Sequence, residues 1–151
     1  MRATVLIAEK NELILEALEG TLSLLGFTVV GTTSKRSDLE ELVFTTKPDL
    51  LVYDMHLSSN GKAGLVDLNP LKAQLPKLKI LGLSFLEAGH QFAAEILNAG
   101  FDGYWNKFNS REMLVEKLNI LFPDDRSVAA ALMPLHFDKE SSGSNESDRV
   151  E

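Results

Sequence analysis

Five short apolar runs alternate with helical patterns over residues 4–122, and this alternation constrains the fold more than any other feature of the chain. Four of the runs are continuous and rich in Leu, Ile or Val, as strands buried on both faces are. The second run is less apolar and is typical of an edge strand. The predicted strands are Thr4–Ala8, Phe27–Val30, Asp49–Tyr53, Lys79–Ser84 and Gly103–Trp105. Strands that alternate with helices predict an α/β fold, a doubly wound five-stranded parallel sheet with helices on both faces.

The segments between these strands carry apolar residues at helical spacing, together with helix-end signals. The first stripe stops before Gly26, a residue suited to the left-handed position that follows a helix. The first predicted helix spans residues 11–25, with Leu13, Ile14, Ala17, Leu18, Thr21 and Leu25 facing inward. The second is opened by a capping box at Ser37–Glu40, the third runs from the cap Asn69 through Pro70 to Gln74, and the fourth is Glu87–Asn98. The fifth is capped by Asn109, with Met113, Leu114, Leu118 and Leu121 facing inward.

The composition of the chain changes after Phe122. Residues 123–151 carry seven acids and three bases, and the final stretch, Asp138–Glu151, is built almost entirely of polar residues and glycine. Such a composition leaves too little apolar surface to bury in a core. We therefore predict one domain over residues 1–122, followed by an acidic and largely disordered tail over residues 123–151.

Composition also excludes several classes of protein. The chain has no cysteine, which excludes disulfides and thiolate metal sites. No apolar run approaches the ~20 residues that span a membrane, and no secretory signal opens the chain, so we expect a cytoplasmic protein without a membrane partner. The formal net charge of −7 argues against nucleic acid as a partner of this chain, and no basic recognition helix is present.

Polar side chains stand at or just after the ends of the predicted strands. They are Glu9, Lys10, Asp54, Ser84 and Lys107. The carboxyl ends of parallel strands meet at one edge of a sheet, where α/β proteins place their binding and reacting groups. We therefore expect these five side chains to lie near one another and to form the functional site.

Four stretches of the sequence resemble a known family in order and spacing. They are VLIAEKNEL, PDLLVYDMHL, ILGLS and AGFDGYWNKF, and together they are similar to bacterial two-component response-regulator receiver domains (CheY-like). The resemblance implies a flavodoxin/CheY-like sheet in the order 2-1-3-4-5. It also implies that Asp54 receives a phosphoryl group from a histidine kinase, that Ser84 and Lys107 contact that group, and that Tyr104 is the switch aromatic.

The acidic pair of the family is where this sequence departs from the pattern. The resemblance implies a Mg²⁺ ion held by two acids after the first strand and by Asp54, but the two positions fall on Glu9 and Lys10. An ammonium cannot ligate Mg²⁺, which prefers oxygen donors. A Mg²⁺ site of Glu9 and Asp54 is therefore expected to be weak or absent.

Two interpretations of Lys10 remain open at this stage. In the first, the Lys10 ammonium takes the place of the metal and, with Lys107, neutralises Glu9 and Asp54, which would make the chain a pseudo-receiver. In the second, Lys10 turns to solvent on its long stem, a weak Mg²⁺ site survives, and Asp54 remains a working phosphoacceptor.

The sequence favours a signalling module over an enzyme. The segment AEKNEL has no glycine-rich or hydroxyl-rich phosphate loop, and His56 stands where an aspartate-based phosphatase has its second acid, so a small flavodoxin-like enzyme is the remote alternative. The expected partners are a histidine kinase or another signalling protein, with a possible homodimer through about Glu87–Leu121. The kinase, the output and whether the chain is an excised domain stay open.

Overall fold

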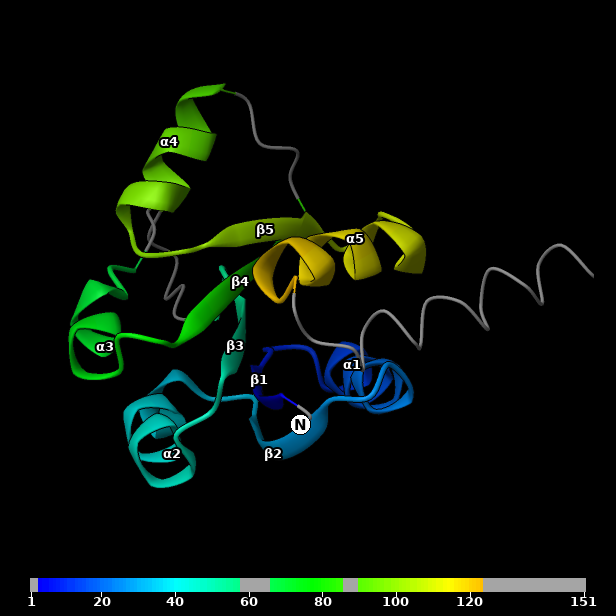
Figure 1. The fold of residues 1–151 in the computed structure, drawn as a ribbon, viewed down its shortest axis with the longest axis horizontal. Coiled ribbons are helices and arrows are strands. Elements are labelled where there is room, and N and C mark those ends of the chain that lie inside the picture. Colours follow the sequence, from blue (N-terminus) through cyan, green and yellow to red (C-terminus); the bar gives the residue numbers. More distant parts are fainter. Residues whose placement is uncertain (1–2, 58–65, 86–89, 124–151) are drawn as a thin grey trace, which may run out of the picture.

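The computed structural model describes residues 3–57, 66–85 and 90–123. Its strands form one parallel sheet in the order β2-β1-β3-β4-β5, which confirms the predicted fold class and strand order (Figure 1). The strands are β1 (Thr4–Ala8), β2 (Thr28–Thr33), β3 (Leu50–Asp54), β4 (Lys79–Ser84) and β5 (Gly103–Asn106). The predicted edge strand, β2, lies at an edge of the sheet and continues to Thr33, three residues further than its apolar run.

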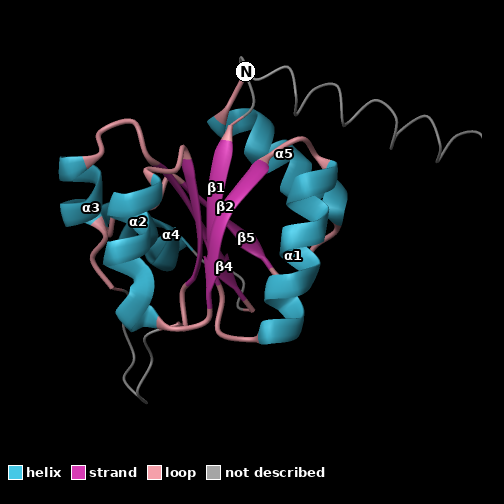
Figure 2. Cartoon of the chain, turned by 90° about the horizontal axis from the view of Figure 1, so that it is seen from below, coloured by secondary structure: helices cyan, strands magenta, loops and turns pink. Residues whose placement is uncertain are grey.

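Helices cover both faces of the sheet (Figure 2). They are α1 (Glu12–Leu24), α2 (Leu39–Thr46), α3 (Asn69–Gln74), α4 (His90–Asn98) and α5 (Arg111–Leu121), with a 3₁₀ turn, η1 (Arg36–Asp38), before α2. Helices α1 and α5 pack on one face, and α2, α3 and α4 on the other. Alternate residues of β1 enter the two cores, Val5 and Ile7 the first, Leu6 and Ala8 the second, as the pleat requires.

The buried stripe of α1 differs from the predicted one. Leu18 and Leu25 are buried as expected, but Leu13 is 78% exposed and Leu22, which the prediction omitted, is fully buried. Leu13 lies in the first turn of α1, beside the carboxyl edge where β1 has already ended, so no strand lies beneath it. In α5, similarly, Met113 is 41% exposed, whereas Leu114 and Leu118 are buried as predicted.

Three predicted helix starts need correction. Ser37 and Glu40 form no capping box, because η1 occupies this segment and Arg36 instead pairs with Glu40 at 2.6 Å. The N-cap of α5 is Ser110, one residue after the predicted Asn109, and its hydroxyl accepts the Met113 N–H at 3.3 Å. The short helix α3 begins at Asn69 itself rather than after it.

Other predictions fall outside the described residues. They are the start of the fourth helix at residues 87–89 and the acidic tail from residue 124 onwards. Within the described ranges, no helix combines the length and apolar character that crossing a membrane requires.

Gly82, in the middle of β4, gives a prediction about stability. A Cβ at this position would contact Met55 Cε and lie 2.9 Å from Phe101 Cδ1, so Gly82→Ala is expected to cost about 1–3 kcal/mol of unfolding free energy through overpacking. Gly20→Ala, in α1, is the matched control: its Cβ meets no described atom within 4 Å, and the helix should gain about 1 kcal/mol. Urea unfolding of both variants checks this, and changes of equal sign would contradict it.

Candidate functional site

Glu9 and Asp54 are brought together by neighbouring strands. Glu9 directly follows β1 and Asp54 ends β3, and these strands are paired through Ala8 and Tyr53. Both carboxyl residues are buried, with exposures of 0% and 1%. Burial of a charged carboxylate is unfavourable unless it is paired or hydrogen-bonded, so the surroundings of these two groups decide how the site works.

Lys107 supplies the cation that faces both carboxylates. Lys107 follows β5. Because β4 lies between β5 and β3, which are two strand spacings or about 10 Å apart, the Lys107 stem has to cross the end of β4 to reach Asp54. Its Nζ lies 2.8 Å from Glu9 Oε1 and 3.3 Å from Asp54 Oδ1. The Lys107 side chain is only 4% exposed. One buried ammonium therefore bridges the two acids.

Backbone N–H groups at the strand ends bind the remaining carboxylate oxygens. The Asn11 N–H donates to Glu9 Oε2 at 2.8 Å. The N–H groups of Lys10 and His56 donate to Asp54 Oδ2 at 3.1 Å and to Asp54 Oδ1 at 2.9 Å. Asn11 also caps α1, its side chain accepting the N–H groups of Leu13 and Ile14. The turn that starts α1 thus fixes the orientation of both acids.

Burial disfavours the charged form of the Glu9 carboxylate. Burial raises the pKa of Glu9 above its ordinary value of 4.5, and neither the Lys107 ammonium nor the Asn11 N–H fully offsets this; the nearby Asp54 raises it further. Two negative charges share one lysine here, so the cluster carries a formal charge of −1 when all three groups are ionised. An additional cation or a proton on Glu9 would neutralise it.

The raised pKa of Glu9 predicts a pH dependence of stability. The folded protein binds the Glu9 proton more tightly than the unfolded chain, so this contribution is fully present below 4.5 and is lost as the pH rises through the raised pKa. We expect the unfolding free energy of wild type to fall more steeply with rising pH than that of Glu9→Gln. Urea unfolding from about pH 4 to about pH 7 measures both slopes.

A substitution at Glu40, measured over the same pH range, is the control for this pH series. Arg36 lowers the pKa of Glu40, so its contribution has the opposite sign and is lost as the pH falls. Because the Glu40 side chain is 53% exposed, its effect should be small. Equal slopes for wild type and Glu9→Gln would contradict the assignment of the raised pKa to Glu9.

The first interpretation of Lys10 needs correction. Lys10 is exposed, and within the described residues its ammonium forms no ion pair. Only its backbone N–H reaches Asp54. The four-charge neutral cluster expected from the sequence is therefore a three-charge cluster of Glu9, Asp54 and Lys107, and Lys107 alone makes the contact that Lys10 was expected to share.

Ser84 and Tyr104 lie where the sequence placed them, on β4 and β5. Ser84 ends β4, is 2% exposed, and its carbonyl accepts the Lys107 N–H at 2.7 Å. Tyr104 packs against the core formed with α2, α3 and α4, while its neighbour Trp105 packs in the core formed with α1 and α5. The Nζ of Lys117 lies 5.2 Å from the Tyr104 ring centroid. The roles of these residues in signalling remain predictions.

Oxygen donors for a metal are few at this edge. Glu9 and Asp54 are the two carboxylates that meet here, and position 10 adds an exposed ammonium. In residues 3–57, 66–85 and 90–123, no group of three or more His, Cys, Asp or Glu side chains is placed to hold a metal ion. Mg²⁺ prefers about six oxygen ligands in near-octahedral geometry, so this chain offers fewer side-chain ligands than the predicted family pattern.

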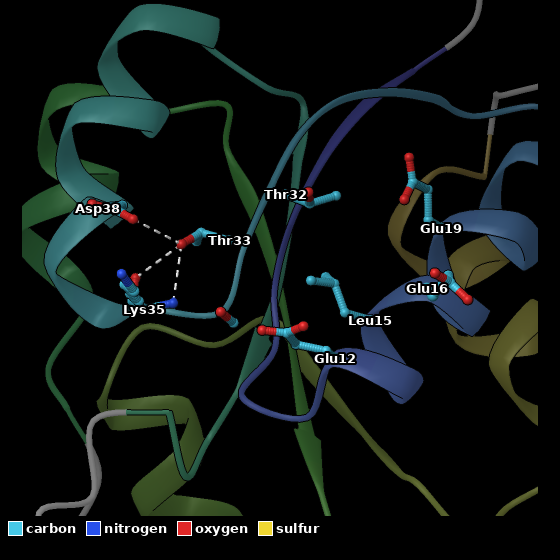
Figure 3. Close-up of a pocket in the computed structure, with 9 residues that line it drawn as sticks. Glu12, Leu15, Glu16, Glu19, Thr32, Thr33, Lys35 and Asp38 are labelled. Carbon is cyan, nitrogen blue, oxygen red and sulfur yellow. Dashed lines mark hydrogen bonds between the residues drawn. The ribbon is translucent and has the colours of Figure 1, made fainter.

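A hollow of about 400 Å³, separate from the Lys107 bridge, lies between α1 and the end of β2. Its lining includes Glu12, Glu16 and Glu19 from α1, with Asp38 and Lys35 opposite (Figure 3). The Thr33 hydroxyl bonds to Asp38 Oδ2 at 3.3 Å and to the backbone of Lys35. Its four acids outnumber its single base, so this hollow is electrostatically unsuited to a phosphoryl group.

Two aromatic residues at the site, Phe85 and Phe108, are not among the site residues predicted from the sequence. Phe85 follows Ser84, and Phe108 follows Lys107. The Lys107 Nζ lies 4.4 Å from the Phe85 ring centroid, and the Phe85 and Phe108 rings are 5.2 Å apart. The sequence signal that could have identified them is a phenylalanine directly after each of the polar site residues Ser84 and Lys107.

Comparisons with known proteins agree on the family and fold. A family model described as "Response regulator receiver domain" matches residues 5–119. A DNA-binding response regulator of the LuxR family from Staphylococcus aureus is similar at 20% identity and TM-score 0.65, covering 79% of this chain and 98% of that one. The NarL receiver domain from Mycobacterium tuberculosis is similar at 21% identity and TM-score 0.67, covering 82% and 98%. No curated protein matched the chain.

A third similar structure corrects the expectation that nucleic acid is not a partner. It is RcsB from Salmonella enterica serovar Typhimurium, bound to the promoter rprA, with 19% identity and TM-score 0.68. The match covers 93% of this chain and 70% of RcsB. A domain of this fold can therefore be part of a DNA-bound protein. Net charge averaged over one domain does not describe what the rest of a protein contacts.

Proposed function

The chain belongs to the response regulator receiver domain family. From this premise we propose that it is a pseudo-receiver, in which the Lys107 bridge leaves little or no Mg²⁺-dependent phosphorylation at Asp54. Receivers are signalling modules of two-component systems, and we place this one among those that act by contact with another protein, without being an enzyme. On this proposal, Asp54 gains little or no phosphoryl group, and the state of the domain is set by its partners.

The observation that carries the proposal is the contact of the buried Lys107 ammonium with Glu9 in addition to Asp54. The Lys107 ammonium lies within 3.3 Å of both carboxylates while its side chain is 4% exposed. A carboxylate attacks a phosphoryl group effectively only when cations neutralise the transferring oxygens. Here the buried Lys107 ammonium already contacts both acids, and the lysine at position 10 repels a second cation instead of binding it.

The donor set supports a weak or absent Mg²⁺ site. Glu9 Oε1 faces Lys107, and Glu9 Oε2 and both Asp54 oxygens accept backbone N–H groups. A metal ion would have to share these oxygens and displace the ammonium. Glu9 and Asp54 would be its side-chain ligands, which leaves the coordination shell short of a third carboxylate.

A working phosphoacceptor is the second candidate function. The observation in its favour is that Asp54, Ser84 and Lys107 end or follow neighbouring strands and lie at one edge, as the resemblance requires. In that case a histidine kinase would transfer a phosphoryl group to Asp54, and the Lys107 ammonium would turn from Glu9 to the new oxygens. Both candidates predict contact between Asp54 and Lys107.

Acetyl phosphate separates the two candidates. We expect the intact mass of the folded protein to stay unchanged after incubation with acetyl phosphate and Mg²⁺. Asp54→Asn serves as the control for modification elsewhere. A gain of one phosphoryl mass in wild type, absent from Asp54→Asn, would establish the working phosphoacceptor and end the first proposal.

The output that we propose is transcriptional. Two of the similar structures are DNA-binding regulators by their descriptions, so a DNA-binding domain or subunit is the class of protein that this receiver would control. A histidine kinase is the partner expected upstream. The homodimer surface at about Glu87–Leu121 and the cytoplasmic location stay predictions.

A further inference from the structure

Two loops meet above the Lys107 bridge through a pair of aromatic rings. Phe85 starts the loop after β4 and Phe108 the turn after β5. Their ring centroids are 5.2 Å apart at an interplanar angle of 45°. The Lys107 Nζ lies 4.4 Å from the Phe85 centroid, inside the ~6 Å range of a cation–π interaction. The ammonium is therefore held between one ring and two carboxylates.

The exposures of these groups show which lies outermost. Phe108 is 78% exposed and Phe85 is 42% exposed, whereas the Lys107 side chain beneath them is 4% exposed. Large apolar side chains gain only part of their burial energy at such positions, and Phe108 gains the least. The two rings contact each other, and Phe85 also contacts the ammonium.

Lys107 is not confined by close packing on every side. A pocket of about 270 Å³ adjoins it between α1 and α5, lined by Ile14, Leu18 and Trp105 among others, and by the two rings. The four-carbon stem of a lysine is flexible and can adopt many rotamers. Without the Phe85 ring, this space would let the ammonium leave the carboxylates part of the time.

From these contacts we propose that Phe85 and Phe108 form an aromatic clamp that positions the Lys107 ammonium on the Glu9–Asp54 pair. The inference rests on the proposed function, because it explains how one lysine stays in place as the resident cation of the site. Phe85 is the main positioning residue, and Phe108 supports its ring.

Competitive acetylation of lysines with acetic anhydride, read by peptide mass spectrometry, tests the clamp. In wild type, Lys107 should react far more slowly than the exposed Lys10. In Phe85→Leu, which keeps apolar bulk and loses the ring, the Lys107 rate should rise about threefold to tenfold. Phe85→Ala should raise it further, and Phe108→Ala should raise it less than Phe85→Ala. Rates within about twofold of wild type in both Phe85 variants would overturn the proposal.

Leu97→Ala, in α4, is the matched control, because Leu97 is also an exposed apolar residue, at 61%. It should leave the Lys107 rate unchanged. The rate of Lys72, which bonds to Asp102 at 2.6 Å far from the clamp, reports whether each variant is folded. Acetyl phosphate applied to the same samples keeps the two proposals distinct: a phosphoryl gain in wild type contradicts the proposed function alone, and an unchanged Lys107 rate contradicts the clamp alone.

Discussion

Replacing Lys107 with Met is expected to lower the free energy of unfolding by about 3–5 kcal/mol, because two buried carboxylates would lose their shared cation. For a domain of this size, such a loss lowers the melting temperature by about ten degrees. Thermal and urea unfolding at neutral pH measure it. Part of the loss should disappear at acid pH, where protonation of Glu9 removes one of the unpaired charges.

The control for this variant is Lys72→Met. The Lys72 ammonium bonds to both oxygens of Asp102, at 2.6 and 2.7 Å, but its side chain is 25% exposed, and water replaces the lost partner. We expect a cost of about 1 kcal/mol or less there. The triple variant Glu9→Gln, Asp54→Asn, Lys107→Met should recover most of the loss, since removing every charge of a buried cluster is often close to neutral. Equal costs for the two lysines would refute the buried bridge.

Much of the fold could be predicted because buried parallel strands carry a strong local signal. β1 and β4 have the predicted bounds, and β3 is displaced by one residue. The meeting of Glu9, Asp54, Ser84 and Lys107 followed from the same signal, since topology brings strand ends together whatever their separation in sequence. The helix starts were less predictable, because a 3₁₀ turn at η1 and a cap shifted by one residue at α5 depend on local turns.

The choice of the neutralising lysine could not be read from sequence proximity. Lys10 stands next to Glu9, but neighbouring residues at a strand end point in opposite directions. Glu9 points into the site, and the Lys10 N–H turns toward Asp54, while the Lys10 side chain is exposed to solvent. Lys107 is distant in sequence and close in space. The Phe85–Phe108 contact was equally hidden, because it joins two loops whose separation depends on how β4 and β5 end.

Replacing Lys10 with Asp is expected to tighten Mg²⁺ binding tenfold or more. The variant changes the charge at position 10 by two units, next to a doubly charged ion, and supplies a third carboxylate. Titration of the fluorescence of Trp105, the single tryptophan, at constant ionic strength reports the affinity. Lys10→Ala should show a smaller gain, because it removes the repulsion without adding a ligand.

Lys47→Asp separates the ligand effect from net charge. It makes the same two-unit change at an exposed residue before β3, at the opposite edge of the sheet, where salt screens it. Its Mg²⁺ affinity should equal that of wild type. If Lys10→Asp bound Mg²⁺ no better than Lys47→Asp, position 10 would not be what weakens the metal site, and the Lys107 bridge and the clamp above it would have to account for the whole effect. Combining Lys10→Asp with Phe85→Leu would then show whether releasing Lys107 restores metal binding.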